Sequence, residues 1–206
     1  MGILDFAILS FASLFVIVDP ISTVPAFLVM THRNSRQEKI SMAALASVVT
    51  FFVLVIFYLG GLGLLHAFGI TVSAFEIAGG IILLIIALDM LQARRTAIKE
   101  TPEEQAEGIG KDDVAIAPLA MPMLAGPGAI TAVILLNSQA ANFAHHSVVI
   151  VSIFLVSLIT FLILWIASVR SSIFSPITLK IITRVMGLLL AAIAVQFIIN
   201  GIQTIL

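Results

Sequence analysis

The sequence contains no cysteine and few charged residues. Without a thiol, the chain cannot form a disulfide, use a thiolate nucleophile or bind a metal through cysteine. Charged residues make up 10% of the 206 residues, whereas a soluble domain carries about 25%. The net charge is -1 and no basic patch is large enough to neutralise phosphates, so we expect no nucleic-acid partner.

Apolar residues are correspondingly abundant in the sequence. They account for 61% of the chain, and the mean hydropathy is +1.21, whereas a soluble domain is about 45–50% apolar. The composition therefore indicates an integral membrane protein. The N-terminal stretch MGILDF lacks the positive residues of a cleavable signal peptide, so we expect the first apolar segment to stay in the mature protein.

Six apolar segments are long enough to cross a bilayer, for which about 20 helical residues suffice. They are too long for strands and show no alternation of apolar and polar residues, which favours helices. The predicted fold is therefore an all-α polytopic membrane protein with six transmembrane helices. The segments are residues 3–30, 41–65, 70–92, 114–138, 147–169 and 177–205.

The ten Lys and Arg residues fall in three clusters. If the N-terminus lies outside, all ten face the cytoplasm, as the positive-inside bias requires. We therefore predict that the termini, the Gly-rich turn near 60–69 and the loop at 139–147 face the periplasmic side, away from the cytoplasm. The clusters are Arg33, Arg36 and Lys39; Arg94, Arg95, Lys99 and Lys111; and Arg170, Lys180 and Arg184.

The six segments divide into two halves of three. A gap-free shift of 107 residues superposes Pro20 on Pro127 and Gly80 on Gly187. Because three is odd, the two halves must lie upside down relative to each other. Inverted repeats are typical of secondary transporters, whose sites lie at the midplane between discontinuous helices. The predicted units are a first repeat at 1–93, a cytoplasmic linker at 94–113 and an inverted second repeat at 114–206.

Proline and glycine interrupt the first and fourth segments at equivalent places. The interruptions are VIVDPISTVPAF (16–27) and APLAMPMLAGPGAITAV (117–133). Proline removes a backbone donor and glycine weakens the helix, so we expect both segments to break near the membrane centre. Such backbone is tolerated only where it is buried in protein or lines a cavity. The alternative interpretation is a simple proline kink in each segment, packed against neighbouring helices.

Each predicted break starts a half-helix with its own chemistry. Asp19 is a favoured N-cap before Pro20, so residues 20–30 form the first half-helix. At Gly126-Pro127 the cap has no side chain, which leaves the following amides free to receive an anion. The pair suits a small zwitterion. The predicted substrate-binding residues are Asp19, Pro20, Ser22, Thr23, Pro25, Gly126, Pro127, Gly128, Ala129 and Thr131.

Other polar groups in the segments have simpler interpretations. Glu76 and Asp89 lie near opposite ends of the third segment, where we expect them to be solvated. Gln196, Asn200 and Gln203 are expected to bond across helices or to reach the outer interface. Small residues permit close helix packing. These are Ala78, Gly79, Gly80 and Gly187.

Four stretches carry a family resemblance over nearly the whole chain: VDPISTVPAF, FGITVSAFEIAGGIILLIIALDM, APLAMPMLAGPGAI and RVMGLLLAAIAVQFIINGI. They resemble the MarC family of bacterial inner-membrane proteins, which includes the SnatA transporters of small neutral amino acids. The resemblance implies six helices and movement of glycine, alanine and similar amino acids. The chain departs from the family pattern at Ser22 and Thr23, where Gly and Asn are common, and at Glu76, where Arg is frequent.

The predicted function is a secondary transporter, either carrier or exporter, of small neutral amino acids. A channel, or a carrier of another small solute, is the alternative, because broken helices also build pores. An intramembrane enzyme is disfavoured, since no HExxH or GxSxG motif is present. We expect no cofactor and no metal, since His145 and His146 are too isolated to form a metal site. Besides substrate and lipid, the pattern is compatible with proton or Na+ coupling and with an oligomer.

Overall fold

The computed structural model describes residues 2–92, 119, 123–170 and 173–205. Within those residues the chain forms helices joined by turns, with no strand, so the predicted all-α class is confirmed. The helices are α1 (Ile3–Val18), α2 (Val24–Met30), α3 (Arg36–Ala67), α4 (Val72–Leu91), α6 (Pro127–Gln139), α7 (Phe143–Val169) and α8 (Pro176–Ile205).

Four of these helices are long and apolar enough to cross a membrane: α3, α4, α7 and residues 177–205 of α8. They correspond to four of the six predicted segments. The predicted segment 3–30 instead contains two helices, the 16-residue α1 and the seven-residue α2. The turn predicted near 60–69 is present but wrong in its extent, because α3 continues through Gly60, Gly61 and Gly63 to Ala67 and the turn occupies residues 68–71.

Side chains at three helix starts explain the helix boundaries. Ser35 begins α3 through a capping box, in which its Oγ accepts from the Glu38 amide at 3.4 Å and its own amide donates to Glu38 Oε2 at 2.6 Å. Thr71 caps α4 by accepting from the Ala74 amide at 3.2 Å. Asn142 caps α7. Each cap satisfies an amide that the first turn of a helix leaves without an acceptor.

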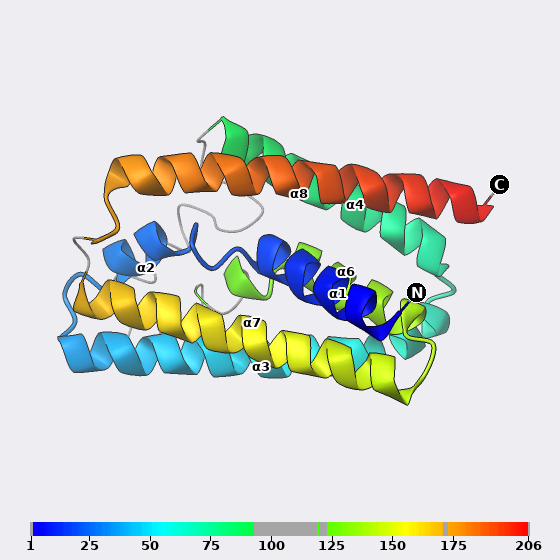
Figure 1. Ribbon diagram of the computed structural model, residues 1–206, viewed down its shortest axis with the longest axis horizontal. Helices are drawn as coiled ribbons and strands as arrows, with labels where there is room; N and C mark the ends of the chain where they lie inside the picture. Colours follow the sequence, from blue (N-terminus) through cyan, green and yellow to red (C-terminus); the bar gives the residue numbers. More distant parts are fainter. Residues whose placement is uncertain (1, 93–118, 120–122, 171–172, 206) are drawn as a thin grey trace.

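Neighbouring helices run antiparallel in pairs (Figure 1): α3 lies along α7, α4 along α8, and α1 beside α6. Both termini lie at one end of the molecule, together with the α3–α4 and α6–α7 turns. The α2–α3 and α7–α8 connections lie at the opposite end. All the basic residues within the described ranges belong to those connections or to the adjacent helix ends. They are Arg33, Arg36, Lys39, Arg170, Lys180 and Arg184.

Glycine brings α4 and α8 close together. A Cβ at Gly80 would lie 2.7 Å from the Ala194 carbonyl oxygen, and one at Gly187 would lie 2.9 Å from Met90 Cβ. The predicted close packing is therefore confirmed for Gly80 and Gly187. Gly79 also makes a close contact, but with Thr131 of α6. The prediction was wrong for Ala78, which is exposed.

Candidate functional site

Asp19 ends helix α1. Its amide donates to the Phe15 carbonyl at 3.0 Å, and its backbone adopts the left-handed conformation, with φ 50° and ψ 64°. Asp is one of the few residues other than glycine that visits this region, because its short side chain bonds locally. Asp19 is 1% exposed. The chain therefore leaves α1 at a buried acidic residue whose backbone turns sharply.

The predicted half-helix beginning at Pro20 is wrong in its boundary. Residues 20–23 form a turn, and α2 begins at Val24. Asp19 is therefore not a helix N-cap; its Oδ1 accepts from the Ser22 amide at 3.4 Å within this turn. Thr23 Oγ1 donates to the Asp19 carbonyl at 3.2 Å. Asp19 thus ends one helix and also holds the turn that leads to the next.

Helix α6 begins as predicted, with Gly126 as an extended N-cap and Pro127 as the first residue. No side chain caps this end. The helical ladder starts where the Ile130 amide donates to the Gly126 carbonyl at 3.1 Å. The amides of Gly128 and Ala129 therefore have no acceptor within the helix, and they carry the positive end of its dipole. Both residues are buried.

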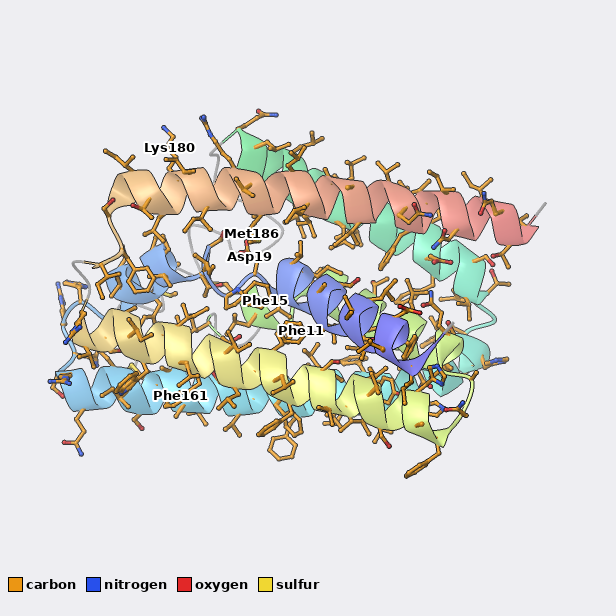
Figure 2. The ribbon with its side chains drawn as sticks, viewed as in Figure 1. Phe11, Phe15, Asp19, Phe161, Lys180 and Met186 are labelled. Atoms are coloured by element: carbon orange, nitrogen blue, oxygen red, sulfur yellow. The ribbon has the colours of Figure 1, made fainter. Side chains whose placement is uncertain are left out.

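The end of α1 and the start of α6 lie side by side. A Cβ at Gly128 would lie 3.5 Å from Ile17 Cγ2, and it would also overlap the side chain of Leu83 on α4. On its other side, the turn after Asp19 contacts α8, because Ser22 Oγ donates to Thr183 Oγ1 at 3.1 Å. In Figure 2, Asp19 lies near the middle of the long axis of the molecule.

The predicted site residues do not all belong to this group. Pro25 is exposed on α2, away from the buried turn. The Thr131 hydroxyl donates to the Pro127 carbonyl at 2.9 Å, so it serves the helix, and its methyl group faces Gly79. The remaining predicted residues are buried or half-buried around the two helix ends. They are Asp19, Pro20, Ser22, Thr23, Gly126, Pro127, Gly128 and Ala129.

The chain matches the model of the MarC family integral membrane proteins over residues 4–206. It belongs to the MarC family. It is 39% identical to a UPF0056 membrane protein of Methanocaldococcus jannaschii over 97% of both chains. A UPF0056 membrane protein of Aquifex aeolicus is 36% identical, over 96% of this chain and 92% of its own. Bacillus subtilis YvbG is 33% identical, over 97% and 95%. No solved structure matches.

A second polar group in this MarC protein was not predicted from the sequence. Tyr58 Oη lies 2.6 Å from His146 Nδ1, and the Asn137 side-chain amide donates to the Tyr58 carbonyl. These contacts connect α3, α6 and α7 near the end that holds the termini (Figure 1). The only available signals were the single tyrosine of the chain and an asparagine within an apolar segment. His146 had been considered only as a metal ligand.

A third polar group lies between α4 and α8. Glu76 is 6% exposed and is hydrogen-bonded to the side chain of Asn200. The prediction that Glu76 is solvated is therefore wrong. The prediction that the polar residues of α8 bond across helices is confirmed for Asn200. Gln196 instead bonds within α8, since its Nε2 donates to Asn200 Oδ1 at 2.7 Å.

Proposed function

We propose that this protein is a secondary transporter of small neutral amino acids, such as glycine and alanine, across a bacterial inner membrane. The substrate binds between the end of α1 and the start of α6, and the protein works as a carrier rather than as an enzyme. The names of its relatives identify membrane proteins and give no substrate. The proposal therefore depends on the chemistry of these two helix ends.

The observation that carries the proposal is the pairing of opposite polarities at two adjacent, buried helix ends. Asp19 contributes a carboxyl group at the end of α1. The amides of Gly128 and Ala129 contribute a positive helix terminus without a capping side chain. An α-amino acid carries the complementary charges on adjacent carbons. Its carboxylate suits the α6 terminus and its ammonium suits Asp19.

The crowding around these groups favours a small ligand. Leu83 occupies the place where a Cβ of Gly128 would lie, and Ile17 Cγ2 is 3.5 Å from that place, so little space is left beside the start of α6. Leu83 belongs to α4, and Ile17 belongs to α1. Movement of α4 relative to α1 and α6 therefore opens or closes the start of α6. In this proposal, that movement is the alternating-access step.

The proposed architecture has six crossings in two inverted repeats. In the first repeat, α1 and α2 together form one crossing with a break at the turn 19–23. In the second, α6 completes a crossing whose first part lies outside the described residues. The 107-residue shift carries Arg36, the first residue of α3, onto Phe143, the first residue of α7. The antiparallel pairing of α3 with α7 and of α4 with α8 also supports a two-fold relation between the repeats.

The test is ligand binding to the purified protein, measured by calorimetry with glycine and two truncated analogues. Glycinamide lacks the carboxylate and acetate lacks the ammonium group. A charge-assisted hydrogen bond contributes about 1.5–3 kcal/mol, so each analogue should bind at least about ten-fold more weakly than glycine. Equal binding of glycine and glycinamide would refute the role of the α6 amides.

Counterflow in proteoliposomes distinguishes a carrier from a channel. Unlabelled glycine inside the vesicles should accelerate the entry of labelled glycine, because a carrier returns faster when it is loaded. A channel would instead let glycine diffuse down its concentration gradient without this acceleration. Alanine should replace glycine in the lumen, whereas leucine, which is too large for the crowded space at Gly128, should not.

A further inference from the structure

Glu76 is a buried carboxyl group that the proposed substrate site does not use. It lies about one turn inside α4, which begins at Val72 near the end of the molecule that holds the termini (Figure 1). It is 6% exposed. Ionisable groups within membrane-spanning helices are costly, and they mark proton and ion pathways.

The hydrogen-bond partner of Glu76 is an amide that suits both protonation states of the acid. A carboxylate can only accept hydrogen bonds, whereas a protonated carboxyl group must also donate one. The side chain of Asn200 offers an NH2 donor and a carbonyl acceptor. Its Oδ1 accepts from Gln196 Nε2 at 2.7 Å, which directs its NH2 group toward other acceptors. Reorientation of this amide lets the Glu76–Asn200 contact survive the gain or loss of a proton.

Close packing of α4 and α8 encloses this pair. A Cβ at Gly201, which follows Asn200, would lie 2.9 Å from the Ser73 carbonyl oxygen and 2.6 Å from Ile77 Cγ1. The two backbones therefore approach closely within one turn of Glu76. This approach explains why the acid is buried although it lies near the end of its helix.

Within the described residues, the two helices that pack most extensively against α4 place no charged group near Glu76. Helix α6 has no titratable side chain, and α8 has only Lys180 and Arg184. Arg184 lies about 24 Å from Asn200 along the axis of α8, at a rise of 1.5 Å per residue. On α4 itself, Asp89 lies about 20 Å further along by the same measure. Gain or loss of a proton at Glu76 therefore changes the local charge without an ion on α4, α6 or α8 nearby to offset it.

The same face of α4 contacts the proposed substrate site. One turn beyond Glu76, Gly79 packs against Thr131 of α6, and Leu83 lies over Gly128. The residue equivalent to Glu76 in the second half is Thr183, which bonds to Ser22 in the turn after Asp19. This position therefore makes a polar contact with another segment of the chain in both halves.

We propose that Glu76 binds a proton and that this proton couples solute movement to the proton gradient. The proposal rests on the proposed transport function and specifies its coupling ion. The carboxylate takes up one proton from the side of the termini and releases it on the other side during the cycle. The Glu76–Asn200 contact links the change in protonation to the packing of α4 on α8. Helix α4 in turn covers the start of α6.

The test compares Glu76→Gln with Asp89→Asn in proteoliposomes. Both variants replace an acid on α4 with its amide, but Asp89 is half-buried at the other end of the helix. In Glu76→Gln, the ratio of glycine accumulation driven by an imposed pH gradient to glycine counterflow should fall at least ten-fold. In Asp89→Asn, this ratio should be unchanged. Gradient-driven accumulation by Glu76→Gln at the parent level would overturn the proposal, as would accumulation driven by Na+ in place of the pH gradient.

Two further measurements keep the proposal testable if the first comparison fails. If Glu76→Gln does not fold, Asn200→Ser should shift the pH midpoint of gradient-driven accumulation, and an unchanged midpoint would overturn the proposal.

If the parent protein shows no glycine counterflow, the proposed function fails, and infrared spectroscopy tests the proton site alone. On acidification, the protonated-carboxyl C=O band, to which the other acids of the chain also contribute, should lack a component in Glu76→Gln that the parent and Asp89→Asn both retain. An identical band in all three proteins would overturn the proposal.

Discussion

Tyr58 on α3 and His146 on α7 are joined by a hydrogen bond of 2.6 Å between Oη and Nδ1. Tyr58 is 1% exposed, and its ring meets the imidazole edge-on at a centroid distance of 6.1 Å. The carbonyl of Tyr58 also accepts from the side chain of Asn137 at the end of α6. One residue therefore connects three helices near the end that holds the termini.

We expect Tyr58→Phe to destabilise the protein by about 0.6 kcal/mol, and by no more than about 1.7 kcal/mol, the range typical of hydrogen bonds between membrane helices. The ring and its packing remain, so the loss reports the hydroxyl alone. The measurement is the free energy of unfolding in a detergent titration. After Tyr58→Phe, His146→Ala should cost less than it does in the parent, and strictly additive effects would show that the two residues do not interact.

The α4–α8 contact gives a prediction with a control in the same chain. Gly80→Ala places a Cβ 2.7 Å from the backbone oxygen of Ala194, which cannot rotate away. We expect a destabilisation of about 1–3 kcal/mol, the usual cost of overpacking. At Gly63, which is exposed on α3, a Cβ meets nothing within 4 Å. Gly63→Ala should therefore stabilise the protein by up to about 1 kcal/mol, and equal effects of the two substitutions would contradict this packing.

The orientation of the protein in the membrane gives a third prediction. The absence of cysteine makes single-cysteine variants straightforward. Ala141 and Gln37 are both exposed. Ala141 lies in the α6–α7 turn, at the end that holds the termini, and Gln37 lies at the start of α3, at the end that holds the basic residues. By the positive-inside bias, an impermeant maleimide should label Ala141→Cys in intact cells and label Gln37→Cys only after lysis. The reverse pattern would invert the proposed topology.

Hydropathy and helix-breaking residues were sufficient to predict much of this fold. Apolar segment length predicted α3, α4, α7 and α8, and proline after glycine predicted the start of α6 at Pro127. The glycines near the end of α3 were misleading, because Gly61 is used to pack against Ile134 rather than to turn the chain. Composition alone does not distinguish these two uses of glycine.

The sequence was less informative about which polar groups meet. Local sequence predicted a capping role for Asp19 before Pro20, whereas its carboxyl group instead accepts from the Ser22 amide within a turn. The contacts of Ser22 with Thr183 and of Tyr58 with His146 join residues far apart in the chain, and no local pattern specifies them. Glu76 was assigned to solvent because it lies near a helix end. Its burial depends on how closely α8 approaches, which the sequence of α4 does not encode.

The role of the Asp19 backbone and the role of its charge can be tested separately by substitution. Asn also tolerates the left-handed conformation, and its Oδ1 can accept from the Ser22 amide, so Asp19→Asn removes the charge while keeping the backbone conformation and this hydrogen bond. In Asp19→Ala, the free energy of unfolding should fall by about 1–2 kcal/mol because alanine is strained in the left-handed conformation. It should fall by a further amount of about 0.5–1.5 kcal/mol because the hydrogen bond is missing. Asp19→Gly relieves the backbone but lacks the acceptor. The melting temperature should therefore decrease from Asn to Gly to Ala.

Binding then distinguishes a structural role of Asp19 from a role in recognition. If its charge attracts the substrate ammonium group, Asp19→Asn should be as stable as the parent and bind glycine at least about ten-fold more weakly, since a hydrogen bond to a charged group is worth about 1.5–3 kcal/mol. Acetate, which has no ammonium group, should lose no affinity in the same variant. If Asp19→Asn binds glycine as the parent does, Asp19 serves only to end α1 and hold the turn, and the ammonium site must lie elsewhere.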